Sequence, residues 1–509
     1  MRQDMFTRRW FIGGAASFGA FGGCRFVCGS GSPSGTPNVK FGVVSDIHIV
    51  CRAKPGDSET KENNELTFVR TLEWFRDQGV DGVIVAGDMA DNGLIDQLVI
   101  VAEAWNRVFP GDRAPDGRKV ERLFVYGNHD LGGVPYARWR IKDKAEDEIR
   151  NLIIYPDPKG VWEKVFNEPF EPIWTKNVKG YRFVGAHWWS MQGCKGRDEA
   201  FNNEVADWYA AHAKDIDPSL PFFHIQHPHP KDTCYGPWAW GRDVGLTTKT
   251  LAQFPNAVAF SGHSHYPLTD ERSVWQGAFT SVGTSSLRYM APAYEEFPGE
   301  GFANSRTSGN NARAIDAAKL QPKMEATEDC REGMLWSVYD DRIVVERREF
   351  LSGMDVGEDW TLPLPAAESK PFAFAERARK IGAPSFPSGA ELRVEKAVAT
   401  TRGAAAKGQN PAIPSVKKEC LKVVIPAAVA KDGARAYYFE VRAQAESGDA
   451  IRKRVLAEGF NHGCGHKRAK AETACLFAQD ELPKGKVRFT VTPLNCYGKA
   501  GAPLEKELS

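Results

Sequence analysis

Apolar residues along the chain follow two different periods. Near-continuous apolar runs at 39–45, 82–86 and 122–126 predict buried strands, because a strand that is covered on both faces is apolar on both. Apolar positions three or four residues apart predict helices around 68–75 and 95–105, between these runs. Further strands are predicted at 181–186, 221–226, 257–260, 334–339 and 342–348. This alternation of strands and helices indicates α/β architecture.

The pattern changes near residue 365. Residues 363–390 are rich in Ala, Pro, Ser and Gly, a composition that predicts a linker. Beyond it, residues 391–509 contain segments that alternate between apolar and polar positions, as at 487–491. Because a period of two is typical of half-buried strands, the sequence predicts an α/β domain at 38–362 followed by a small all-β sandwich domain.

Residues 1–37 have the composition of an export signal followed by a tether. Arg8 and Arg9 precede a short, weakly apolar run, and this pattern resembles a bacterial twin-arginine (Tat) signal peptide. The run is too short to cross a bilayer, which needs about 20 residues. Cys24 follows Phe-Gly-Gly and is a candidate lipid attachment site, the alternative being a later cleavage that removes it. We therefore expect export by Tat to the periplasm or cell surface, with Cys24 as a candidate lipid anchor.

The charges of the 509-residue chain nearly cancel, with 66 Lys and Arg against 65 Asp and Glu and a formal net charge of +1. A general nucleic-acid binder or a polybasic membrane-surface protein needs an excess of positive charge. Both classes are therefore disfavoured, and no specific nucleic-acid binding is expected.

The C-terminal region holds four cysteines and a histidine-rich motif. In an oxidising compartment the cysteines could form disulfides, and the alternative is that they are buried thiols. They are Cys420, Cys464, Cys475 and Cys496. Residues 462–466 read His-Gly-Cys-Gly-His, for which a surface loop is favoured over a metal site because no fourth ligand stands at zinc spacing.

Residues that could bind metal or take part in catalysis occur in five short segments, each directly after a predicted strand. These are Asp46-Ile47-His48, Gly87-Asp88, Gly127-Asn128-His129-Asp130, His227 and Gly262-His263-Ser264-His265. Polar groups at the ends of apolar strands gather at one edge of a sheet, where α/β proteins bind their ligands. Oxygen and imidazole donors without a thiolate suit divalent Mn, Fe, Zn or Ni, and the number of donors favours two ions over one.

Taken in order, the five blocks resemble those of the calcineurin-like metallophosphoesterase superfamily. The resemblance implies a four-layer α/β/β/α sandwich and two divalent metal ions as cofactors. It implies that one ion is held by Asp46, His48 and His265, that the other is held by Asn128, His227 and His263, and that Asp88 bridges the two. The glycines at 87, 127 and 262 are expected to let the backbone turn sharply before each ligand. The implied reaction is hydrolysis of a phosphomonoester or phosphodiester, in a small-molecule or lipid substrate, by a hydroxide that bridges the ions.

The same family pattern assigns roles beside the metal ligands. The resemblance implies that His129 stabilises the phosphoryl oxygens or protonates the leaving group, and that Asp130 orients His129. Asp91 stands where purple acid phosphatases have a metal-binding Tyr, which argues against that iron–tyrosinate branch. Asp91 or Asn92 is expected only to turn the chain before the next helix.

Two alternatives stay open around His227. The sequence there offers three histidines, of which His227 is favoured for metal binding and His229 is the competitor. Just beyond, Trp238, Trp240 and Arg242 are candidates for substrate binding, since aromatic rings stack on a base or sugar and Arg pairs with phosphate. The alternative is that the tryptophans pack this loop against the protein.

The C-terminal domain resembles a fibronectin type III module, in which residues 482–498 would be the last hairpin. Such modules space, dock or cap other domains, and no catalysis is assigned to this one. The favoured function is therefore an exported, dinuclear metal-dependent phosphoesterase, either a phosphatase or a phosphodiesterase. The alternative is a non-catalytic cell-surface binding protein that retains the phosphoesterase scaffold. The complete set of ligand blocks favours the enzyme.

Overall fold

The computed structural model describes most of the chain. The described residues are 35–57, 64–188, 197–236, 243–291, 301–307, 311–431, 435–463 and 466–508. The predicted export signal with Cys24, the substrate candidates Trp238, Trp240 and Arg242, and the thiol of Cys464 lie outside them.

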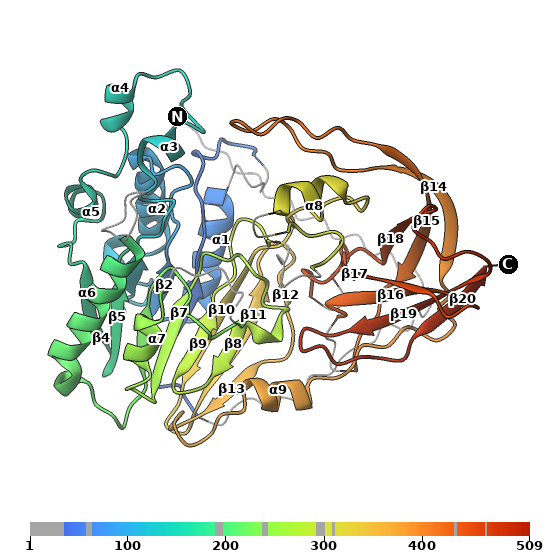
Figure 1. Ribbon diagram of the computed structural model, residues 1–509. Coiled ribbons are helices and arrows are strands. Elements are labelled where there is room, and N and C mark those ends of the chain that lie inside the picture. Colours follow the sequence, from blue (N-terminus) through green and yellow to red (C-terminus); the bar gives the residue numbers. More distant parts are fainter. Residues whose placement is uncertain are drawn as a thin grey trace, which may run out of the picture. The chain divides into compact units, whose positions relative to one another are not determined.

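Two mixed sheets make up the first part of the chain (Figure 1). The first sheet has the order β12 (Met354–Asp355), β11 (Arg342–Glu349), β10 (Glu332–Val338), β1 (Val39–Val44), β2 (Gly82–Ala86) and β3 (Glu121–Val125), with β13 (Trp360–Pro363) beside β11. The second has the order β4 (Ile173–Val178), β5 (Tyr181–Ala186), β6 (Phe222–Ile225), β7 (Ala257–Ser261), β9 (Thr280–Gly283) and β8 (Val274–Gln276). Strands β1 to β3 are parallel, as are β5, β6, β7 and β9. The apolar runs predicted as buried strands are therefore confirmed.

Helices cover the outer face of each sheet, while the inner faces pack together. The described α-helices are α1 (Asn64–Asp77), α2 (Ile95–Val108), α3 (Gly133–Ala137), α4 (Glu146–Arg150), α5 (Pro158–Phe166), α6 (Arg197–His212), α7 (Leu246–Leu251), α8 (Ala312–Ala318) and α9 (Phe374–Lys380). Along β2, Val83 and Val85 pack with α1 and α2, whereas Ile84 packs with the second sheet. Between the sheets, the ring centroids of Phe41 on β1 and Phe223 on β6 lie 4.8 Å apart. With α6 and α7 on the second sheet, the predicted four-layer α/β/β/α fold is confirmed.

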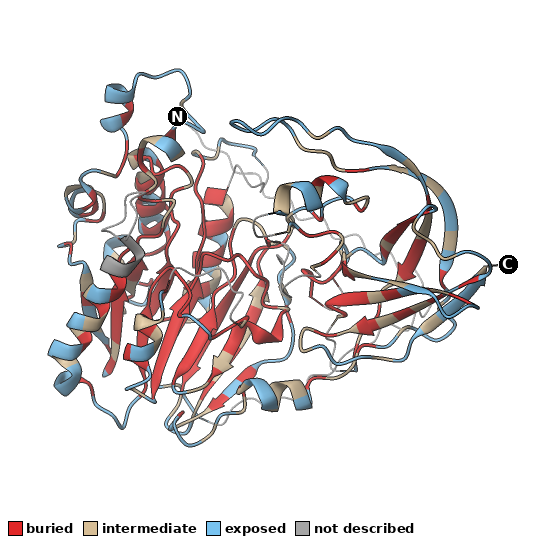
Figure 2. Cartoon of the chain, viewed as in Figure 1, coloured by how far each residue is buried: buried red, intermediate tan, exposed pale blue. Residues whose placement is uncertain are grey.

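The last part of the chain is all β, as predicted, and its sheets are antiparallel. One sheet has the order β14 (Arg393–Thr400), β15 (Lys417–Pro426) and β18 (Glu472–Ala478), and the other has the order β17 (Ala450–Leu456), β16 (Tyr438–Ala445), β19 (Val487–Leu494) and β20 (Leu504–Leu508). Val423 and Phe477 from the first sheet and Phe439 and Phe489 from the second share one apolar core. Figure 2 shows these buried inner faces, and the more exposed outer strands β14 and β20.

A segment of the predicted first domain packs into this C-terminal core. Phe302 and Met324 are buried among its apolar residues. The side-chain amide of Asn304 exchanges two hydrogen bonds with the backbone of Leu456 on β17, at 2.9 and 3.1 Å. Residues 363–390, which were predicted as a linker, contain helix α9. The all-β region is therefore held to the α/β part by side-chain packing as well as by chain connectivity.

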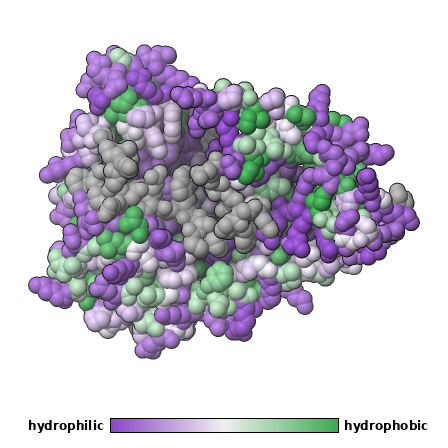
Figure 3. Space-filling view, in the orientation of Figure 1, coloured by the Kyte–Doolittle hydropathy of each residue, from purple (hydrophilic) through white to green (hydrophobic). Residues whose placement is uncertain are grey.

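The described cysteines are free thiols, and Cys420 and Cys475 are buried in the C-terminal core region. For these residues the thiol alternative holds. Among the described residues, no helix combines the length and the apolar character needed to cross a bilayer. On the face shown in Figure 3, the coloured residues are mostly hydrophilic, with apolar patches scattered among them.

Candidate metal centre

The predicted metal ligands follow strands of both sheets. They come after β1 (Asp46, His48), β2 (Asp88), β3 (Asn128), β6 (His227) and β7 (His263, His265). All of them are buried except Asn128, which is half-buried. The site therefore forms where the carboxyl ends of parallel strands from the two sheets meet.

Asp46, His48 and His265 form one group of donors. The Nε2 atom of His265 lies 3.0 Å from Asp46 Oδ1 and 3.1 Å from His48 Nε2. The Nε2 atom of His48 lies 3.7 Å from Asp46 Oδ1. The three side chains therefore direct a carboxylate oxygen and two imidazole nitrogens toward one point, and they could hold a metal ion.

Asp88, His227 and His263 form a second group that could hold a metal ion. The Nε2 atom of His227 lies 3.1 Å from Asp88 Oδ2 and 3.1 Å from Asn128 Oδ1. His227 is fixed from behind, because its Nδ1 contacts the backbone carbonyl of Ala86 at 2.7 Å. The structure thus brings all seven predicted ligands into two adjacent groups.

The spacing and chemistry of these donors fit two divalent ions. Two ligands that each lie about 2.1 Å from one ion, at roughly 90–110° to each other, are about 3.0–3.5 Å apart. The pairs at 3.0 and 3.1 Å lie within that range. Carboxylate, amide and imidazole donors without a thiolate suit divalent ions of intermediate hardness.

The backbone carries strain at the same residues. Asp46, His48, Asp88, His263 and His265 all have positive φ, between 49° and 71°. Non-glycine residues held in this left-handed region cost about 1–3 kcal/mol each and cluster at functional sites. Hydrogen bonds between the loops hold this conformation, from Asp46 N to Gly87 O at 3.0 Å and from His48 N to Asp88 O at 2.9 Å.

The glycines that precede the ligands mainly make room for neighbouring side chains. Of the three, only Gly87 has positive φ, at 92°. A Cβ atom on Gly127 would lie 2.2 Å from Asp88 Oδ1, and one on Gly262 would lie 2.4 Å from Asp46 Oδ2. The expected sharp turn therefore holds at Gly87, whereas the other two glycines let a ligand carboxylate approach the backbone.

Burial and mutual charge shift the protonation of this group. Burial alone would raise the pKa of Asp46, but the charge of His265 holds it well below its usual range. The pKa of Asp88 is likewise lowered, against burial, by His227. Burial would lower the pKa of His227, but the negative charge of Asp88 raises it to about 9. An ion that binds here must displace imidazole protons, so metal binding is expected to release protons.

The comparison with protein families agrees with this geometry. A family model described as "Calcineurin-like phosphoesterase" matches residues 39–267, and all five blocks lie inside that range. Residues 39–267 form a calcineurin-like phosphoesterase domain. No curated protein matches the chain.

Solved structures similar to this chain come from several organisms. A dimetal phosphatase from Danio rerio has a TM-score of 0.33 and 12% identity, covering 64% of this chain and 99% of that chain. GAP50, the anchor in the inner membrane complex of Plasmodium, has a TM-score of 0.35 and 12% identity, covering 64% and 88%. Purple acid phosphatase PPD1 from yellow lupin has a TM-score of 0.35 and 11% identity, covering 64% and 54%.

The expected contact between Asp130 and His129 in the phosphoesterase domain is replaced by others. The Asp130 carboxylate accepts hydrogen bonds from the backbone amides of Ala90, at 2.7 Å, and Gly127, at 2.8 Å. Burial and the charge of Asp88 raise the pKa of Asp130 to about 7. Asp130 therefore ties together the loops after β2 and β3. The Nδ1 atom of His129 is instead held by the backbone carbonyl of Asp91, at 2.7 Å.

Asp91 does more than turn the chain. Its Oδ1 lies 3.2 Å from His48 Nδ1 and forms an ion pair with Arg288. With burial opposing them, His48 and Arg288 lower the pKa of Asp91 to about 2. Asp91, His48 and His129 form a third group that could hold a metal ion. Arg288 stands far from Asp91 in the sequence, so no local pattern could have revealed this pair.

His229, the alternative ligand, lies among hydroxyl groups. Its Nδ1 is 2.6 Å from Ser261 Oγ and its Nε2 is 2.8 Å from Ser264 Oγ. Burial lowers the pKa of His229 to about 3. Because both ring nitrogens are engaged by hydroxyls, His227 is the histidine of this segment that faces Asp88.

Trp188 closes one side of the second donor group. Its ring centroid lies 5.7 Å from that of His227 and 5.6 Å from that of His263, and its side chain is buried. The two imidazoles are themselves buried beside this indole ring.

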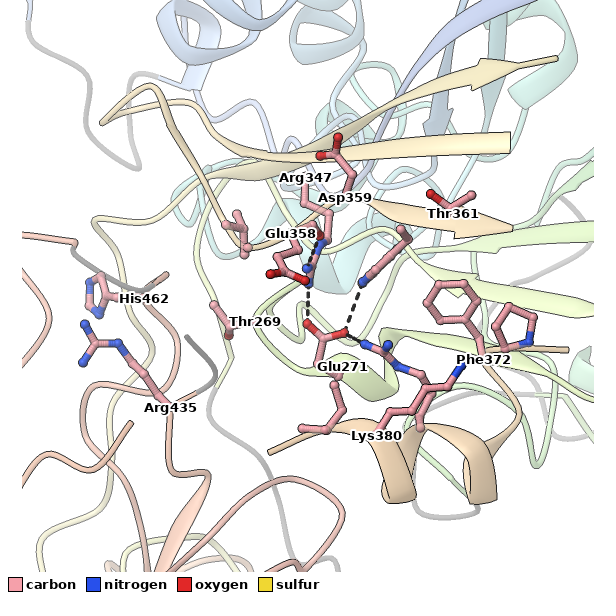
Figure 4. Close-up of a pocket in the computed structure, with 16 residues that line it drawn as sticks. Thr269, Glu271, Arg347, Glu358, Asp359, Thr361, Phe372, Lys380, Arg435 and His462 are labelled. Atoms are coloured by element: carbon pink, nitrogen blue, oxygen red, sulfur yellow. Dashed lines mark hydrogen bonds and ion pairs between the residues drawn. The ribbon is translucent and has the colours of Figure 1, made fainter. Parts of the chain in front are cut away.

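One cavity, of about 360 Å³, lies apart from the metal centre (Figure 4). Within it, Glu271 forms ion pairs with Arg347, at 2.9 Å, and with Arg377. Burial would raise the pKa of Glu271, but the two guanidinium groups lower it. Arg435 and His462 line the same cavity from the C-terminal region. Since the carboxylate is matched by cations of the protein, we assign this ion pair a structural role.

Proposed function

We propose that this protein is an exported phosphoesterase that uses two divalent ions, of Mn, Fe, Zn or Ni, to hydrolyse phosphomonoesters or phosphodiesters. One observation carries the proposal: Asp88 Oδ2 lies 3.1 Å from His227 Nε2 and 3.7 Å from His48 Nε2. The Asp88 carboxylate thus faces both donor groups, as a ligand shared by two ions would. The matched family supports the same reaction class.

Different residues of this chain would have different roles around these ions. When bound, two such ions lower the pKa of a coordinated water and offset charge on phosphate oxygens. Asp46 and Asp88 supply buried negative charge that would balance part of the ions' charge. Trp188 lies beside the buried imidazoles of the second donor group, and their burial strengthens electrostatic interactions there.

His129 is placed to act on the leaving group. Its Nδ1 donates to the Asp91 carbonyl, which leaves Nε2 for a substrate. Burial and the charge of His48 lower the pKa of His129 to about 4, whereas the negative charge of a bound phosphate would favour the protonated ring. In that form Nε2 can give a proton to the departing oxygen.

Removal of metal is expected to abolish hydrolysis reversibly. After treatment with a chelator, turnover of 4-nitrophenyl phosphate and bis(4-nitrophenyl) phosphate should fall to background, because the donor groups alone supply no nucleophile. Separate additions of Mn, Fe, Zn and Ni should restore it with at least one metal and show which ester is preferred. Undiminished turnover in protein shown to be metal-free by elemental analysis would refute the proposal and favour a retained scaffold.

We also propose that Arg8 and Arg9 direct export by the Tat route, on the strength of their place before a short apolar run. Replacing both by Lys should trap the protein in the cytoplasm, which cell fractionation measures. Arg2→Lys, outside the pair, is the matched control and should be exported normally. Export of the double variant at the normal level would show that another signal is used.

We propose, further, that residues 391–509 are a fibronectin type III-like module without a catalytic role. The division of their strands into a 3-stranded and a 4-stranded antiparallel sheet around one core supports this. The predicted donors of the metal centre all come from residues 46–265.

A further inference from the structure

An aromatic pair stands beside His129. The rings of Tyr136 and Trp139 are stacked, with centroids 4.4 Å apart and planes 20° apart. His129 meets both rings edge to face, at 4.8 Å from Tyr136 and 5.9 Å from Trp139. On its other side, His129 lies 4.4 Å from the ring of His48. His129 therefore stands between the metal centre and this pair.

Packing and a backbone hydrogen bond hold the two rings in place. Tyr136 belongs to helix α3, and its ring lies over Gly132, where a Cβ atom would come within 2.2 Å of it. The next residue, Ala137, packs in an apolar cluster with Leu94 and Ile149. The backbone amide of Trp139 donates to the carbonyl of Tyr136 at 3.1 Å. The stack is thus fixed relative to the loop that carries Asn128 and His129.

Trp139 is nevertheless open to solvent. Its side chain is 57% exposed, and it is the most exposed of the described tryptophans. Trp105, Trp188 and Trp336, by contrast, are fully buried. An exposed ring held rigidly at the edge of a candidate site offers a flat apolar surface to a ligand.

We propose that the stack of Trp139 on Tyr136 binds a planar aromatic group of the substrate, so that the substrate is a phosphate ester whose leaving alcohol carries an aromatic ring, as a nucleoside does. The inference rests on the proposed function. With the phosphate at the metal centre and the departing oxygen at His129, the rest of the alcohol extends toward Trp139. Aromatic side chains bind bases in this way through stacking.

The test compares esters that differ in one ring. Adenosine 5′-phosphate is paired with ribose 5-phosphate, and 2-phenylethyl phosphate with 2-cyclohexylethyl phosphate; each leaving group is a primary alcohol. Methyl diesters of the same alcohols are used if only diesters turn over. Wild type should prefer the aromatic member of a pair in kcat/KM, and Trp139→Ala should reduce that preference about tenfold, the scale of base–aromatic stacking. Trp139→Phe should retain most of it.

Phe374→Ala is the matched control, since Phe374 is 48% exposed on helix α9, and it should leave the preference unchanged. A preference in the nucleotide pair alone would identify a nucleobase, and one in both pairs any aromatic ring. A preference that survives Trp139→Ala, or an equal loss for both members of each pair, would overturn the inference while leaving the hydrolase intact. No turnover of any ester by metal-loaded protein would overturn the proposed function with it.

Discussion

Asp88→Asn is expected to abolish both metal binding and turnover. The amide keeps the oxygen that accepts the 2.7 Å hydrogen bond from His129 N, so the loop should keep its shape. What changes is Oδ2, which becomes an NH₂ group directed at His227 and His48. A donor at that point repels a cation. We expect kcat/KM to fall at least about a thousandfold, since the ions lower the barrier by on the order of 4 kcal/mol or more.

Elemental analysis and hydrolysis of bis(4-nitrophenyl) phosphate measure the two effects together. Asp116→Asn is the matched control, because Asp116 is exposed and its ion pair within the described part of the chain is with Arg118, two residues away. It should keep the wild-type metal content and rate. If the Asp88 variant retained two ions and most of its turnover, Asp88 would not be a bridging ligand.

His129→Gln is expected to lower kcat without loss of metal. His129 is absent from the group of Asp46, His48 and His265 and from the group of Asp88, His227 and His263. Loss of a general acid lowers the rate about 100- to 10,000-fold. The loss should be large for an alkyl phosphate and small for 4-nitrophenyl phosphate, because 4-nitrophenolate leaves without a proton. His212→Gln, on helix α6 and stacked on Trp208, is the control.

The metal content of this variant tests whether His129 acts on the leaving group or binds an ion. His129 also groups with His48 and Asp91 around a point that could hold an ion. Loss of one ion from the His129 variant, with equal losses for both substrates, would make His129 a ligand and remove it from the leaving-group step.

Much of the fold was predictable because its strands are apolar on both faces. A strand that is apolar on both faces, such as 82–86, is removed from water only when other layers of the fold cover both of its faces, so its sequence predicts a buried position. Less predictable were contacts between distant segments. Helix α9 within 363–390 and the packing of Phe302 into the C-terminal core depend on which surfaces meet, and neither leaves a periodic signal in its own segment.

At the site, too, some features could be predicted from the sequence and others could not. The order of the blocks after the strands predicted which donors would converge, because strand ends are fixed by the sheet. The family resemblance implied that Asp130 orients His129, whereas in the structure its carboxylate accepts hydrogen bonds from the backbone amides of Ala90 and Gly127. Asp91 was underestimated because its role depends on Arg288, which comes from a loop nearly two hundred residues later.

The most direct test of the account is anomalous diffraction from crystals of the full chain grown with Mn or Zn. The account predicts two peaks about 3.5–4 Å apart, one within bonding distance of Asp46, His48 and His265, the other beside His227 and His263, with the Asp88 carboxylate between them. A single peak, or peaks that avoid Asp88, would contradict it.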